Sequence, residues 1–244
     1  MPEILLDQII GYTIGAKEMI NGLTSKKDKK FNLAILPFGE GFYTGILQSA
    51  GYMLLKKSAK NLATIHIQND NPKSININLN DILCSFGNSR KPQKNIQTLI
   101  KKYKFKSTHT TIANEIKTQT PFIDVLTETK EILDIGIGKE IQKETINNFL
   151  KFIKENKSDY NFVFLSNLNQ KIDHKTGKKE DKQILLDLMN KKISDNVKNN
   201  FLLVYLFQES VKATKSQADI IAYSNSGDYG GNSKFTNGYG CVLG

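Results

Sequence analysis

Continuous apolar runs alternate with segments of helical periodicity along most of this chain. Four runs have the length and the β-branched or aromatic content of buried strands: FNLAILPF (31–38), NLATIHIQN (61–69), EILDIGIG (131–138) and YNFVFLSN (160–167). Apolar residues recur at helical spacing in the segments around them, notably at 43–60, 94–105 and 139–157. Repeated strand–helix alternation is typical of a mostly parallel sheet flanked by helices, so we expect an α/β fold.

Further segments extend this pattern. SININLNDIL (74–83) alternates apolar and polar residues, as a strand with one wet face does. Helices are expected around 178–192 and 200–213, and the C-terminal segment 238–243 is expected to join the sheet. Ligands of such sheets bind beyond the carboxyl ends of the strands, so we look for chemistry in the loops PFGEGFYTG, QNDNP and SNLNQKID.

The length of 244 residues is enough to bury one full core. We expect a single domain over 1–244, with an N-terminal helical segment and lysine-rich loop at 1–30 and the α/β core at 31–244. No apolar run approaches the roughly 18 residues of a membrane span. The first residues, MPEILLDQIIGYTIG, lack the basic region and cleavage site of a signal peptide, which predicts a cytoplasmic protein. Cys84 and Cys241 form no disulfide framework or Cys-x-x-Cys motif, and we expect both to be buried.

The net charge of +10 raises nucleic acid as a partner, because clustered cations neutralise phosphates. Arg90 is the only arginine, so the bidentate guanidinium contacts that read guanine or grip phosphate are almost absent. The lysine runs SKKDKK, IKKYKFK and HKTGKKEDK are scattered and interleaved with acids. We therefore expect solvated surfaces and no specific nucleic-acid binding, with non-specific polyanion binding as a distant alternative.

The stretch YSNSGDYGGNSKFTNGYGCVL (223–243) resembles the C-terminal signature of the Memo family, called AmmeMemoRadiSam system protein B in prokaryotes. That signature runs Tyr-Ala-x-Ser-Gly-Asp, a short loop, then Val-Val-Gly-Tyr-Ala. Three more stretches resemble family motifs in the same order: LPFGEGFYTG (36–45), NEIKTQTPFI (114–123) and FLSNLNQ (164–170). The resemblance runs from about residue 32 to the C-terminus. It implies a fold related to class III extradiol dioxygenases and an AMMECR-type or radical-SAM protein partner.

The resemblance also implies a site where the family carries histidines, an aspartate and a cysteine. This sequence carries other residues there. The first histidine position holds Phe38, the second falls at Asn69 or Asp70, and the one before the Pro-Phe pair holds Asn114. In the following loop, Asn167 stands for the aspartate.

Two further positions of that site have also changed. Gln170 stands for the histidine of the same loop, and the cysteine position falls at Lys198 or Asn199. By resemblance, the candidate pocket residues are Phe38, Tyr43, Asn69, Asn114, Asn167, Gln170, Ser226 and Asp228. We expect five of these to cluster at one end of the sheet: Phe38, Tyr43, Asn114, Asn167 and Gln170.

The residue types at these positions exclude the family's metal chemistry. Phenylalanine, asparagine and glutamine offer a transition metal either nothing or a weakly binding carbonyl, and an amide does not titrate near neutrality. We expect no metal, no cofactor and no catalytic residue, as in a pseudoenzyme that keeps a polar pocket or a protein-docking role. The alternative is a metal-dependent enzyme, dioxygenase-like or hydrolase-like, whose ligands or base come from His109, Asp70, Asp228 or Lys198.

The segment SGDYGG (226–231) allows two interpretations. As structure, it is a turn in which glycines permit positive φ and Asp228 bonds nearby amides, and it leads from a helix into the last strand. As function, Ser226 and Asp228 line the pocket. The remaining histidines are expected to be structural or superficial, with His66 inside a strand and His174 in a lysine-rich surface loop.

Overall fold

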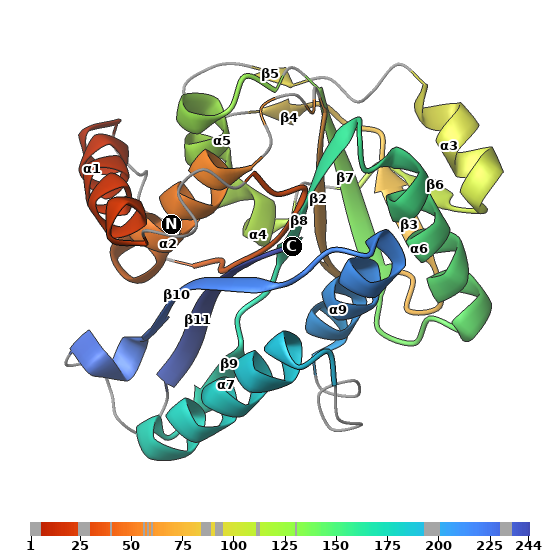
Figure 1. Cartoon of the computed structure of the whole chain (residues 1–244). Coiled ribbons are helices and arrows are strands. Elements are labelled where there is room, and N and C mark those ends of the chain that lie inside the picture. The colour runs from red at the N-terminus through yellow and green to blue at the C-terminus, as the bar shows by residue number, and fades with distance from the viewer. Residues whose placement is uncertain are drawn as a thin grey trace.

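The computed structural model describes residues 6–23, 30–39, 41–55, 57, 59, 61–83, 89–90, 95–110, 113–129, 131–192, 201–229 and 236–244. Its main feature is a nine-stranded sheet (Figure 1). Eight strands follow the order β10-β11-β1-β8-β2-β7-β3-β6, and β9 pairs with β11.

The centre of the sheet consists of four parallel strands. These are β1 (Leu33–Leu36), β8 (Tyr160–Leu165), β2 (Asn61–Gln68) and β7 (Glu131–Gly138). They coincide with the four apolar runs, so this prediction is confirmed. Nearly every residue in them is buried, which is why their sequences are apolar on both faces rather than alternating.

Antiparallel pairs extend the sheet on both sides. On one side, β3 (Ile75–Asn78) pairs with β7, and β6 (Lys106–Thr108) runs parallel to β3. On the other, β11 (Thr236–Leu243) pairs with β1 and with β10 (Asp219–Asn225), and β9 (Asn169–Ile172) pairs with β11. The predicted C-terminal strand is therefore present. A short ribbon of β4 (Ile82–Leu83) and β5 (Ser89–Arg90) stands apart from this sheet.

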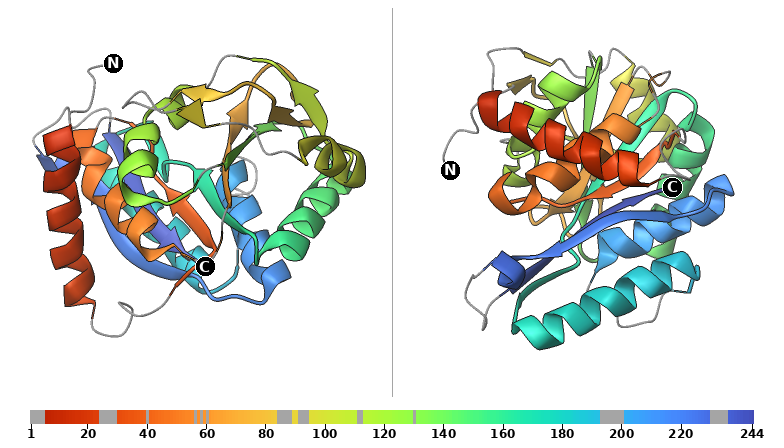
Figure 2. Two further views of the ribbon diagram at one scale, coloured as in Figure 1. Left: turned by 90° about the horizontal axis from the view of Figure 1, so that it is seen from above. Right: turned by 60° about the vertical axis from the view of Figure 1, so that its left-hand side comes forward.

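Helices cover both faces of the sheet, as the left view of Figure 2 shows. One face carries α1 (Leu6–Gly22), α2 (Gly41–Leu54), α4 (Asn114–Lys117) and α5 (Thr120–Leu126). The other carries α3 (Ile96–Tyr103), α6 (Lys143–Asn156) and α9 (Leu202–Thr214). The long α7 (His174–Met189) lies along β9, β10 and β11. The chain is thus one α/β domain. None of the helices in the described segments combines the length and the apolar character needed to cross a membrane.

Alternate residues of each central strand face two separate hydrophobic cores. Leu33 and Ile35 of β1 belong to the core under α6 and α9, whereas Ala34 and Leu36 belong to the core under α1 and α2. The first core contains a run of aromatic rings with centroids 5.1 to 6.2 Å apart, most of them edge to face: Tyr103, Phe105, Phe149, Phe152, Tyr160, Phe162, Phe164 and Phe207. Such packing is favourable beyond the area it buries.

Two expectations about the C-terminal half are wrong. His174 does not lie in a loop but begins α7, because the Asp173 side chain caps the helix by accepting a hydrogen bond from the Thr176 N–H. The SGDYGG segment does not follow a helix but follows β10, and its first residues form the short 3-10 helix η1 (Ser226–Tyr229). β10 was not predicted because its sequence, DIIAYSN, carries polar residues on both sides and so lacks the continuous apolar run of the central strands.

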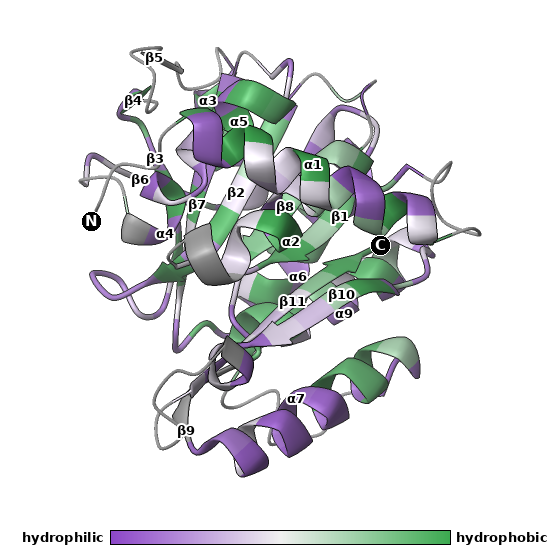
Figure 3. Ribbon diagram, turned by 90° about the vertical axis from the view of Figure 1, so that its left-hand side faces the viewer, coloured by the Kyte–Doolittle hydropathy of each residue, from purple (hydrophilic) through white to green (hydrophobic). Residues whose placement is uncertain are grey.

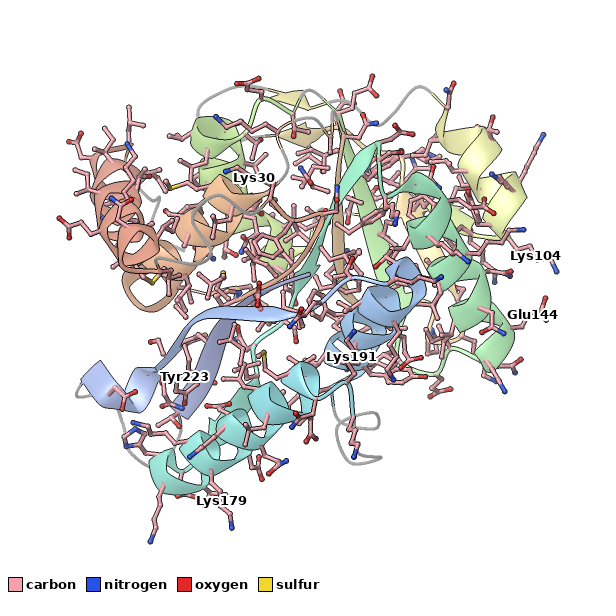
Figure 4. The ribbon with its side chains drawn as sticks, in the orientation of Figure 1. Lys30, Lys104, Glu144, Lys179, Lys191 and Tyr223 are labelled. Carbon is pink, nitrogen blue, oxygen red and sulfur yellow. The ribbon has the colours of Figure 1, made fainter. Side chains whose placement is uncertain are left out.

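The lysines of the runs IKKYKFK and HKTGKKEDK are exposed, and most of the run SKKDKK lies outside the described residues. Figure 3 shows the hydrophilic character of most of α7, and in Figure 4 Lys179 points away from that helix. Across the molecule, Lys104 Nζ pairs with Glu144 Oε1 at 2.9 Å, and both side chains are more than two-thirds exposed. Exposed pairs of this kind contribute little to stability, which agrees with solvated lysine faces.

Candidate functional site

A polar cavity of about 320 Å³ opens near the carboxyl ends of β2 and β7, next to β3. Its inner wall includes six polar side chains: His66, Gln68, Asn76, Asn78, Glu115 and Asp134. Asn69 and Asp70, which follow β2, are exposed at its rim. We call this the His66 cavity. It lies where ligands of parallel sheets generally bind.

The cavity exists because one face of the sheet changes from apolar to polar along the strands. On β2, Leu62 packs in the core, but His66 and Gln68 on the same face are polar. On β7, Ile132 packs in the core and Asp134 follows it on that face. A single buried acid inside the apolar run EILDIGIG was the sequence signal for this site, since buried carboxylates need partners.

His66 and Asp134 form a buried ion pair. His66 Nε2 lies 2.9 Å from Asp134 Oδ1, and His66 Nδ1 lies 3.0 Å from the Ile67 carbonyl oxygen. Both ring nitrogens therefore face oxygen acceptors, so the doubly protonated imidazolium satisfies both contacts. Burial lowers the pKa of His66, but the hydrogen bond and negative charge of Asp134, with Glu115 adding to them, outweigh it and leave that pKa raised.

Amide side chains complete the inner wall. Asn78 Nδ2 donates to Asp134 Oδ2 at 3.1 Å and to the Thr110 carbonyl at 3.1 Å. Gln68 Nε2 donates to the Ser74 and Asn71 carbonyls, and its Oε1 accepts from Asn76. This network fixes the wall in one arrangement before any ligand arrives.

Replacing His66 with glutamine is expected to lower the free energy of unfolding by about 1.5–3 kcal/mol at low pH, the usual value for hydrogen bonds to charged groups. Because the folded state raises the pKa of His66, its contribution is full below the unfolded pKa of about 6.5 and is lost as pH rises through the folded pKa. Denaturant unfolding of both proteins between pH 5.5 and 9 measures this. A penalty that stays constant or grows with pH would contradict the ion pair.

Two of the predicted site residues meet each other. The backbone N–H of Phe38 donates to Asn167 Oδ1 at 3.1 Å, joining the loop after β1 to the loop after β8. The Phe38 ring packs against the core under α1 and α2. The neighbouring Pro37 carbonyl accepts from Gln48 and Gln119, both at 3.0 Å. These positions therefore hold loops in place.

The other candidates are distributed as follows. Asn69 and Asp70 lie at the rim of the His66 cavity, and His109 Nδ1 lies 3.2 Å from Asn80 Oδ1. Tyr43, Asn114 and Gln170 lie in α2, α4 and β9, and their side chains fall outside the described part of the structure. The predicted cluster of five residues is thus seen only at Phe38 and Asn167. Three more positions lie outside the described residues: Cys84, Lys198 and Asn199. Cys241 is buried, as expected.

Ser226 and Asp228 lie at the far end of β10, beside α7. Ser226 Oγ accepts from the Asn237 N–H at 3.0 Å. Asp228 Oδ1 contacts Lys178 Nζ at 2.8 Å and His174 Nε2 at 3.0 Å. The sequence analysis expected Asp228 to bond nearby backbone amides, but it bonds to side chains of α7 instead. The bond from Lys178, with help from His174, lowers the pKa of Asp228. Asp228 follows β10 and His109 follows β6, and these two strands lie at opposite ends of the sheet order.

The signature residues Tyr223 and Gly238 surround a buried carboxylate that the sequence analysis missed. Asp181 of α7 is fully buried and accepts from Tyr223 Oη at 2.6 Å and from Asn225 Nδ2 at 3.2 Å. Figure 4 shows Tyr223 between β10 and α7. A Cβ at Gly238 would lie 2.1 Å from both Asp181 oxygens, so only glycine fits there. We call this group the Asp181 anchor.

The described residues contain no group of three or more His, Cys, Asp or Glu side chains placed to hold a metal ion. The side chains at Phe38 and Asn167 do not fit a metal either, because one is apolar and the other already accepts a backbone hydrogen bond.

Comparison with known proteins finds a likeness in fold. No family model matches the chain, and no curated protein matches it. Among solved structures, the crystal structure of the uncharacterized protein JW3007 from Escherichia coli K12 superimposes with a TM-score of 0.53 at 9% sequence identity. The match covers 88% of this chain and 100% of that one. At this identity the likeness concerns the α/β fold alone.

Proposed function

We propose that this chain is a non-catalytic relative of the Memo family that binds a small polar ligand at the carboxyl edge of its sheet. The motif resemblance over residues 36–45, 114–123, 164–170 and 223–243 supports the family assignment. By that resemblance, an AMMECR-type or radical-SAM protein is the proposed partner. Ligand binding rests on the His66 cavity, which is polar, prearranged and open at the edge where such sheets bind ligands.

The observation that carries the non-catalytic part is the hydrogen bond from the Phe38 N–H to Asn167 Oδ1. The resemblance places metal ligands at both positions. Here one side chain packs against the core and the other holds a backbone amide. Both positions have a structural role, so a metal at this place would have to break contacts that now join two loops.

The chain, purified without an affinity tag, is expected to hold far less than one iron, copper or zinc per molecule and to cleave no catechol ring. Elemental analysis and an oxygen-consumption assay test this. A single Phe38→His substitution is expected to leave metal content unchanged, because a site needs three or four donors in fixed geometry. The combined Phe38→His, Asn114→His and Gln170→His variant is the informative comparison. About one tightly bound metal per unmutated chain would contradict the proposal and favour an enzyme with ligands elsewhere.

A further inference from the structure

We infer that the His66 cavity takes a small organic cation, one that carries an ammonium or guanidinium group. This inference rests on the proposed ligand-binding function and adds the chemical class of the ligand. It comes from the sign of the charges around the cavity and from which hydrogen-bonding groups of its wall are already in use.

The charge around the cavity is negative although the chain is strongly basic. Three carboxylates line it: Asp70 at the rim, Glu115 of α4 and Asp134 of β7. His66 is the single histidine of the lining, and no lysine or arginine belongs to the described lining. Even with His66 protonated, the balance is one positive against three negative charges. Such a cavity attracts cations and repels phosphates and carboxylates.

The charged groups of the wall that remain open to a ligand are acceptors. Both ring N–H groups of His66 and both amide N–H groups of Gln68 and of Asn78 already donate to protein oxygens. In contrast, Asp134 Oδ1 accepts a bond from His66 and Oδ2 accepts one from Asn78, and a carboxylate oxygen can accept a second bond. In the described part of the chain, no hydrogen bond or ion pair engages the carboxylate of Asp70 or of Glu115. A fitting ligand therefore brings several N–H donors and a positive charge.

Size and layout favour an organic skeleton. A volume of about 320 Å³ lies at the lower end of small-molecule sites, which span roughly 300–1,000 Å³. The carboxylates stand on three different elements: the loop after β2, α4 and β7. Donors spread over a short chain, as in a diamine or a guanidino amine, can reach separate acceptors. A metal ion instead needs donors that converge on one point.

The test is calorimetric titration of the full chain at low salt with agmatine and putrescine as cationic probes. Succinate and orthophosphate serve as anionic probes, and calcium chloride serves as an inorganic cation. Agmatine or putrescine is expected to bind, the anions are not, and binding is expected to weaken as salt rises. Glu115→Gln should weaken binding about tenfold or more, the usual effect of losing a hydrogen bond to a charged group. Asp70→Asn, in an exposed loop, should weaken it without risk to the fold.

Glu18→Gln on α1, which packs against α2 and α5, makes the same charge change elsewhere and should leave affinity unchanged. Cation binding that changes with neither cavity substitution would overturn the inference, and so would a result in which neither agmatine nor putrescine binds. Binding of succinate, phosphate or calcium that is lost in Glu115→Gln would overturn the cation assignment while keeping the cavity as a ligand site. The metal analysis above tests the non-catalytic proposal separately.

Discussion

The Phe152→Ala variant is expected to lose about 3–5 kcal/mol of unfolding free energy, the usual cost of emptying the place of a buried phenylalanine. Phe152 of α6 is fully buried, and its ring lies 5.1–5.8 Å from four other rings: Tyr103, Phe105, Tyr160 and Phe162. Removing it leaves a cavity between α6, β8 and the segment after α3. It also removes the edge-to-face contacts that order these rings.

Urea unfolding followed by circular dichroism measures this loss. In the Phe152→Leu variant, leucine fills part of the volume of the phenylalanine ring, so the loss of unfolding free energy should be clearly smaller than in Phe152→Ala. Leu186→Ala removes an apolar side chain that is 45% exposed and should change stability by less than about 0.5 kcal/mol. If Phe152→Ala were no worse than Leu186→Ala, the packing of α6 described here would be wrong.

The Gly238→Ala variant is expected to lose about 3 kcal/mol or more of unfolding free energy. The new Cβ would lie 2.1 Å from both oxygens of Asp181, so the carboxylate must move. Moving it breaks bonds to Tyr223 and Asn225 and leaves a buried charge poorly paired. Overpacking itself costs about 1–3 kcal/mol, and a lost hydrogen bond to a charged group adds about 1.5–3 kcal/mol.

A second glycine provides the matched comparison. Gly11 of α1 has no atom within 4 Å of an added Cβ, so Gly11→Ala should be neutral or should stabilise the helix by up to about 1 kcal/mol. Thermal unfolding of the two variants separates a steric effect from a general effect of alanine. Equal melting temperatures for the two would show that Asp181 does not lie against Gly238.

The central sheet could be predicted because its four parallel strands are buried on both faces, so their sequences are continuous apolar runs. β10 could not be predicted from the sequence, because this seven-residue segment with polar residues gains its strand conformation from pairing with β11. The start of α7 was also missed, since Asp173 acts as a cap only once the helix is in place.

The candidate site was predicted less completely than the fold. Of the five residues expected to cluster, Phe38 and Asn167 lie in neighbouring loops and are hydrogen-bonded, and Asn69 lies at the cavity rim. The pair at the centre of the cavity, His66 and Asp134, was not identified because the two residues are far apart in sequence and meet only through the pairing of β2 with β7. Asp181 was not identified for the same reason, since its partners lie on β10 and β11, far from it in the sequence.

The pairing of β1 with β11 affects how this protein is made. Ala34 pairs with Leu243, so a strand near the beginning of the chain finds its neighbour at the very end of the described sequence. During synthesis, β1 has β8 on one side long before β11 leaves the ribosome. Until then its other edge is open and apolar, and exposed edges of this kind recruit other chains. The edge of β1 that faces β11 is therefore an aggregation hazard in every state of the chain in which β11 has not yet paired with it.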